Sequence, residues 1–161
     1  MGKTIHVDLS EKGVASAIKE LRAYQKWVET KSKELRLRLA QLGATVASIQ
    51  FSRAIYNGTN DVTVRVDDTG SVAVIYAEGE SVAFIEFGSG AKYGYGHPQA
   101  TEFGVGPGTY PDGKGHWDDP NGWWYGHGQH SYGNPPAQAM YGAVQMITEQ
   151  VTKIAKEVFS S

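Results

Sequence analysis

Apolar residues recur with a seven-residue period over the first quarter of the chain, and no proline interrupts residues 10–42. Ser10 supplies an acceptor oxygen for a helix N-cap, and Gly43 is suited to a C-cap. The pattern predicts one helix between them, roughly 45 Å long at 1.5 Å per residue. Either this helix packs wholly on its own sheet, or part of its apolar stripe contacts another subunit. The stripe consists of Val14, Leu21, Val28, Leu35 and Leu42.

Two further patterns complete the regular elements. Residues 44–56 favour a helical continuation that runs into a strand, and alternation over residues 62–66 and 72–77 predicts an antiparallel hairpin. A last helix is expected to begin with Asn134 as its cap and Pro135 in its first position. Its apolar stripe is expected to close the core over the sheet. The stripe consists of Met140, Val144, Ile147, Val151, Ile154, Ala155 and Val158.

Residues 81–90 contain the densest apolar run, with Glu86 as its single acid. A run of this length fits a buried strand or a short helix equally well. Burial of Glu86 would raise its pKa and could suit a catalytic acid or base. Because no second carboxylate lies at motif spacing, we favour a structural Glu86 paired with lysine, arginine or a backbone amide.

A long segment, residues 89–134, separates this run from the last helix and is rich in glycine and aromatic residues. Loops of this length are uncommon in compact domains unless they are functional or disordered, and disordered tracts are poor in aromatics. We therefore expect the segment to order against its own body or a neighbour. The whole pattern predicts a single α+β domain over residues 1–161, with two helices packed on a small antiparallel sheet.

Composition narrows the classes of function. The formal net charge of -2 and the pI near 6.2 argue against a dedicated nucleic-acid binder. The chain has no cysteine, which excludes disulfides and thiolate metal sites. No apolar run approaches the roughly 20 residues needed to cross a bilayer, and no signal peptide is recognisable. These features predict a soluble, cytosolic protein without membrane contact.

Three kinds of chemistry remain as candidates for residues 89–134. His127 and His130, with Asp118 or Asp119, could supply metal ligands, and His127, His130 and Asp118 could serve a metal-dependent hydrolase, although their spacing matches no metal motif. Exposed tryptophan and tyrosine rings could bind a glycan, and the same residue types are enriched at protein interfaces. We favour the interface and predict no catalytic residue, no metal and no cofactor. The predicted inter-subunit residues are Glu86, Phe87, Trp117, Trp123, Trp124 and Tyr125.

Four segments together resemble the head-tail joining proteins of tailed phages, also called tail-completion or neck proteins. Phe84–Gly90 (FIEFGSG) resembles their fIEFGTG signature, and residues 57–62 (NGTNDV) resemble a G-x-N-D-V turn into a strand. Residues 122–125 (GWWY) resemble the aromatic element of an inserted loop. Residues 133–140 (GNPPAQAM) resemble the G-x-P-A-x-P-M entry to the last helix. Ser89 and Ala139 depart from the usual threonine and proline.

The resemblance implies a non-enzymatic virion protein, assembled in the host bacterial cytoplasm and located in the neck or tail. Such a protein forms a ring that joins capsid to tail, contacts neighbouring neck or tail proteins, and meets DNA only as passing cargo. Closed rings arise from heterologous contacts that repeat until the rotation closes. A six-fold ring is expected first and a twelve-fold ring second, with a glycan or cell-wall binding module as the alternative function.

Overall fold

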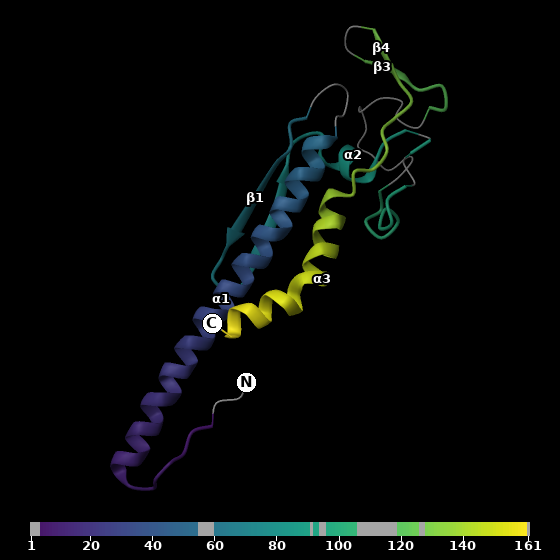
Figure 1. The fold of residues 1–161 in the computed structure, drawn as a ribbon. Helices are drawn as coiled ribbons and strands as arrows, with labels where there is room; N and C mark the ends of the chain where they lie inside the picture. Colours follow the sequence, from purple (N-terminus) through teal and green to yellow (C-terminus); the bar gives the residue numbers. More distant parts are fainter. Residues whose placement is uncertain are drawn as a thin grey trace.

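Helix α1 (Glu11–Arg53) is the longest element of the computed structural model, about 65 Å at 1.5 Å per residue (Figure 1). The structure describes residues 4–54, 60–90, 92–93, 96–105, 119–125 and 128–160. As predicted, the fold is α+β: α1 and the C-terminal helix α3 (Ala139–Ser160) pack together and on a small antiparallel sheet. None of the helices described is long and apolar enough to span a bilayer.

The N-terminal cap of α1 is confirmed, because the Ser10 hydroxyl accepts a hydrogen bond from the Gly13 N–H at 3.1 Å. The predicted end at Gly43 is wrong, since the helix continues to Arg53. Gly43 is buried where α3 and the sheet both approach α1, and a Cβ there would lie 2.6 Å from a methyl of Ile147 and of Ile75. The glycine therefore permits close packing and does not end the helix. Residues 44–53 are wholly helical, without the expected change to a strand.

The predicted hairpin is confirmed as β1 (Thr63–Asp68) and β2 (Ala73–Glu78), paired from Thr63 opposite Glu78 to Asp68 opposite Ala73. The burial of β1 alternates as the sequence pattern indicated. Arg36 of α1 donates from Nε and Nη2 to Oδ1 of Asp68, at 3.1 and 2.9 Å, and so holds the turn end of the hairpin against the helix.

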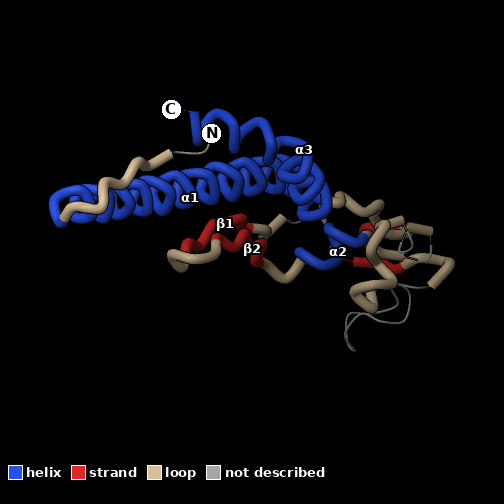
Figure 2. The backbone as a smooth tube through the Cα atoms, turned by 90° about the horizontal axis from the view of Figure 1, so that it is seen from below, coloured by secondary structure: helices blue, strands red, loops and turns tan. Residues whose placement is uncertain are grey.

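The core lies where α1 passes between the hairpin and α3 (Figures 1 and 2). Small residues of α1 allow α3 to approach closely, and larger side chains of α1 and α2 (Val82–Phe87) fill the remaining volume. Residues 81–90 therefore contain a short helix, which decides between the two elements that the sequence left open. The buried cluster consists of Ala47, Phe51, Phe84, Ile85, Ala139 and Ala143.

Helix α3 begins at Ala139, so the predicted start at Pro135 is wrong. Pro135 precedes another proline, and the residue before a proline is disfavoured in the α region. Gln138, directly before the helix, has φ of 52° and is the one non-glycine residue with positive φ in the part of the chain that the structure describes. The backbone thus changes direction sharply at the residue where the helix begins.

The N-terminal half of α1 projects beyond the hairpin and α3 (Figure 1). Here the predicted stripe faces solvent, and Val14, Ile18 and Leu21 are all exposed. Residues 4–9 lie alongside this half of α1 without forming a strand (Figure 2). Among the stripe residues of α3, Val144 and Val151 are likewise exposed, whereas Val158 is fully buried. Each helix therefore has a wider apolar surface than the chain itself covers.

Asn60 caps the C-terminus of α1 through its side-chain amide, which donates to the carbonyls of Phe51 at 2.6 Å and Ala54 at 2.8 Å. Asn60→Asp would place a carboxylate against these carbonyls and the negative end of the helix dipole. We expect it to lower the free energy of unfolding by about 1 to 2 kcal/mol in urea denaturation. Asn121→Asp, at an exposed turn position, is the matched control. Equal stability of the two variants would contradict this account of Asn60.

Candidate functional site

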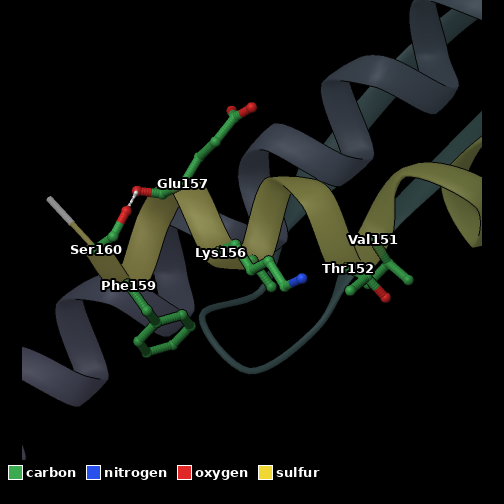
Figure 3. Close-up of a pocket in the computed structure, with 7 residues that line it drawn as sticks. Val151, Thr152, Lys156, Glu157, Phe159 and Ser160 are labelled. Carbon is green, nitrogen blue, oxygen red and sulfur yellow. Dashed lines mark hydrogen bonds between the residues drawn. The ribbon is translucent and has the colours of Figure 1, made fainter. Parts of the chain in front are cut away.

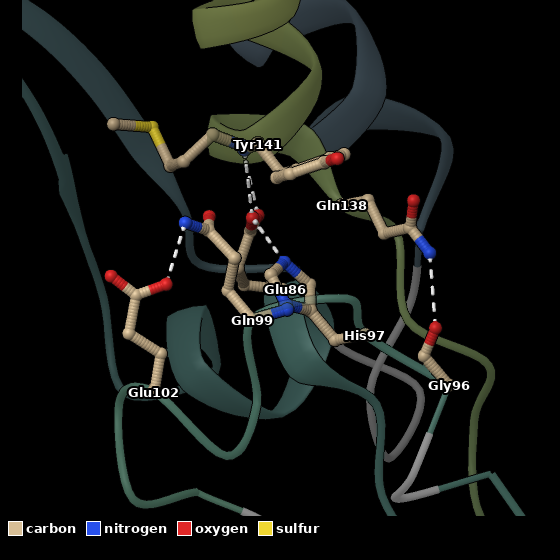
Figure 4. Close-up of polar contacts among 8 residues, drawn as sticks. Glu86, Gly96, His97, Gln99, Glu102, Gln138 and Tyr141 are labelled. Atoms are coloured by element: carbon tan, nitrogen blue, oxygen red, sulfur yellow. Dashed lines mark hydrogen bonds and ion pairs between the residues drawn. The ribbon is translucent and has the colours of Figure 1, made fainter.

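The Glu86 carboxylate lies at the start of α3 and binds the amides of the second and third residues of that helix (Figure 4). Oε2 accepts from the Met140 N–H at 2.9 Å, and Oε1 accepts from the Tyr141 N–H at 3.0 Å. The first N–H groups of a helix have no partner within it, and the positive end of the helix dipole attracts an anion. Glu86, buried on α2, therefore caps a helix that begins more than fifty residues later in the sequence.

His97 completes the coordination of this carboxylate. Its Nε2 lies 3.2 Å from Glu86 Oε1, and its Nδ1 accepts a hydrogen bond from the Gln99 N–H at 3.1 Å. Because Nδ1 is an acceptor, the proton of the neutral ring is on Nε2, from which it donates to Glu86. The ring packs against Phe87, at 4.5 Å between centroids, and against Tyr141, at 5.6 Å. The side chain of His97 is only 1% exposed, so water does not compete for these contacts.

Residues 89–134, hereafter the insertion, leave and rejoin the body through two backbone segments in close contact. Ser89 and Asn134 exchange both backbone hydrogen bonds, at 2.9 and 3.1 Å. Gly133, with φ of 105°, packs so tightly that a Cβ would lie 2.0 Å from the Ser89 carbonyl oxygen. Gly88 and Gly90 also have positive φ. The glycines that flank Ser89 and precede Asn134 are therefore required by the base of the insertion.

Asp61 holds the turn that leads into α2. Its carboxylate accepts hydrogen bonds from the backbone N–H groups of Glu80 and Ser81. A hydrogen bond with the Ser81 side chain, together with these two backbone N–H groups, lowers the pKa of Asp61 below its ordinary value of 3.8, against the opposing effect of desolvation. The adjacent residues Asn60 and Asp61 thus hold the end of α1 and the turn before α2.

Within the insertion, β3 (Trp123–Tyr125) and β4 (Gln129–Ser131) form a second antiparallel hairpin. Trp123 packs against the buried core cluster, whereas Trp124 is 71% exposed. The His130 ring lies between Trp124 and Tyr132, with both centroid distances at 4.6 Å. The hairpin therefore attaches to the body through one tryptophan and presents the other to solvent.

The structure separates the predicted interface residues into distinct groups. Glu86 is enclosed by its own chain, Phe87 is half-buried beside His97, and Trp124 is exposed. Trp117 and the side chain of Tyr125 lie outside the described residues. Contact of these side chains with a neighbouring subunit stays a prediction.

The residues considered for a metal site are only partly described. His127 and Asp118 lie outside the described residues, and His130 packs between two aromatic rings. In the described ranges, no three histidine or acidic side chains converge to form a group that could hold a metal ion. The predicted partner of Glu86 is confirmed as a backbone amide, whereas the role of His97 was missed because no motif distinguishes it from the other histidines.

No protein-family model matches the chain, and no curated protein or solved structure shows significant similarity to it.

Glu86→Gln would replace one acceptor oxygen by an NH₂ group that faces a helix N–H or the His97 ring. We expect the free energy of unfolding, measured in urea, to fall by about 3 kcal/mol, because a buried donor loses its charged acceptor. Glu102→Gln removes the same charge at an exposed position and should change it by less than about 0.5 kcal/mol. A small, equal effect of both substitutions would contradict the capping role of Glu86.

Asp61→Asn should make the chain less stable at pH 7 and less sensitive to acid. A carboxylate with a lowered pKa stabilises the folded state above its unfolded value of 3.8, and this contribution is lost as the pH falls through the folded value. The acid-induced loss of stability between pH 5 and pH 2.5 should therefore be smaller in Asp61→Asn than in the wild type. Part of the loss should remain, because hydrogen bonds from the Gly70 N–H and Arg36 also lower the pKa of Asp68. Exposed Asp67→Asn is the control, and a wild-type acid response in Asp61→Asn would refute the assignment.

Proposed function

We propose that the chain is a non-enzymatic structural protein of a tailed-phage virion, part of the head-tail connector, neck or tail-completion ring. In this function it joins the capsid to the tail and lets DNA pass through the ring. A six-fold ring is favoured and a twelve-fold ring comes second. Its partners are further copies of the chain and neighbouring neck or tail proteins.

One observation carries the proposal: the four segments that resemble this family meet at a single junction. Glu86 binds the amides at the start of α3, Ser89 pairs with Asn134, and Val62 packs against the buried cluster that contains Phe84 and Ile85. Trp123 packs against the core next to them. Segments up to 80 residues apart in sequence thus depend on one another, which favours a shared structural role for the motif residues over chance similarity.

The surface also supports an assembly. The projecting half of α1 exposes apolar side chains, and α3 carries an open apolar groove beside Val151 and Phe159 (Figure 3). The insertion adds exposed Trp124 and Tyr132 at the other end of the molecule. Exposed apolar patches of this kind mark interaction sites. The projecting half of α1 and the insertion lie at opposite ends, which suits repeated contacts between different surfaces, as a ring requires.

The test is the mass of the purified chain by light scattering, followed by negative-stain images. We expect rings with a central hole.

Trp124→Ala should lower the fraction of the chain found in rings at least tenfold, because truncating a side chain at an interface removes area that is buried there. The circular dichroism spectrum should not change, because Trp124 is exposed in the single chain. Trp123 is unsuitable because it packs on the core. Val72→Ala, at an exposed position of the other hairpin, is the control. Normal rings in Trp124→Ala would exclude this interface.

A glycan-binding module remains the second candidate because residues of the insertion line a cleft. The cleft has a volume of about 540 Å³, within the range of ligand sites, and combines aromatic rings with polar groups of Lys92, Asp119 and His130. This function predicts a monomer whose tryptophan fluorescence is quenched by cell-wall sugars. A chain that stays monomeric at every concentration and binds peptidoglycan would overturn the ring proposal.

A further inference from the structure

The start of α3 conflicts with the local sequence that precedes it. Pro136 is well suited to the first position of a helix, because proline lacks the N–H that would be unpaired there. Ala137 and Gln138 follow it and are both good helix formers. Local preference therefore favours a helix from Pro136, three residues before the observed start at Ala139.

Contacts with α2 hold these three residues out of the helix. The Ala137 N–H donates to the Ile85 carbonyl at 2.7 Å, and the Gln138 N–H donates to the Glu86 carbonyl at 3.2 Å. The Gln138 side chain binds the Gly96 carbonyl at 3.2 Å. Gln138 has φ of 52°, a conformation that is unfavourable for a residue with a Cβ. Strain at this residue is therefore balanced by contacts with α2 and the insertion.

We infer that α3 has two alternative starts, and that the Glu86 carboxylate selects the shorter helix. In the longer helix, Met140 and Tyr141 would donate to the carbonyls of Pro136 and Ala137, as i to i−4 geometry requires. The same two N–H groups now bind Glu86, so the two arrangements exclude each other. Elongation would also break the bonds of Ala137 and Gln138 to α2, which lie next to the base of the insertion.

The longer helix therefore uncouples the returning end of the insertion from α2. A partner that binds the insertion more tightly when α3 is in its longer form would shift the equilibrium toward the longer helix. The size of the shift is set by the difference between the partner's affinities for the two forms. The use of this change during ring assembly rests on the proposed function. The two starts of α3 are a property of the single chain and are tested without assembly.

Amide hydrogen exchange, resolved by residue, tests the inference on the purified wild-type chain. In the longer helix Ala137 and Gln138 occupy the first turn and have no acceptor, whereas Met140 and Tyr141 keep one. We expect the amides of Ala137 and Gln138 to exchange at least tenfold faster than those of Met140 and Tyr141. The exchange should occur through a local opening whose free energy is lower than that of global unfolding. Exchange of all four amides at one rate would indicate simple fraying and overturn the inference.

Two substitutions at one position separate backbone from side-chain effects. Gln138→Gly and Gln138→Ala both lose the hydrogen bond to Gly96, but only glycine removes the penalty of positive φ. Exchange at Ala137 should be about tenfold slower in the glycine variant than in the alanine variant. Equal rates would refute a strained, shorter helix. A chain that stays monomeric at every concentration and binds peptidoglycan would refute the proposed function and leave this result unaffected.

Discussion

The capping of α3 by Glu86 is the interaction on which the arrangement of the whole C-terminal half depends. A helix whose N-terminus is enclosed needs acceptors for its first amides, and neither Asn134 nor the prolines provide them here. Because the acceptor comes from α2, it fixes the position of α3 relative to α2 and hence to α1. The base of the insertion lies directly beside it, so one buried carboxylate positions three parts of the chain.

Side chains also cap both ends of α1, Ser10 its start and Asn60 its end. Asp61 binds the amides of the turn before α2. Except for Ser10, each capping residue comes from outside the helix and its flanking turn. Residues 60–61 are therefore fixed both to the end of α1 and to the turn before α2.

The elements that sequence predicted correctly are those that local pattern determines. The β1–β2 hairpin follows from alternation, and the start of α1 from Ser10. The wrong predictions concern helix ends that residues distant in the sequence determine. The end of α1 is capped by Asn60 and Gly43 is instead a packing position against Ile75 and Ile147, while the start of α3 depends on Glu86. His97 was not recognisable because its partner and its burial exist only in the folded chain.

Gly43 has a consequence for how the sequence can change. Side chains from the sheet and from α3 meet at this one position of α1, so the hydrogen of glycine sets the distance between two layers at once. A larger residue there must be accompanied by a smaller one at Ile75, Ile147 or both. Related chains should therefore show covariation among these three positions, and a chain with alanine or serine at position 43 should carry valine or alanine opposite it.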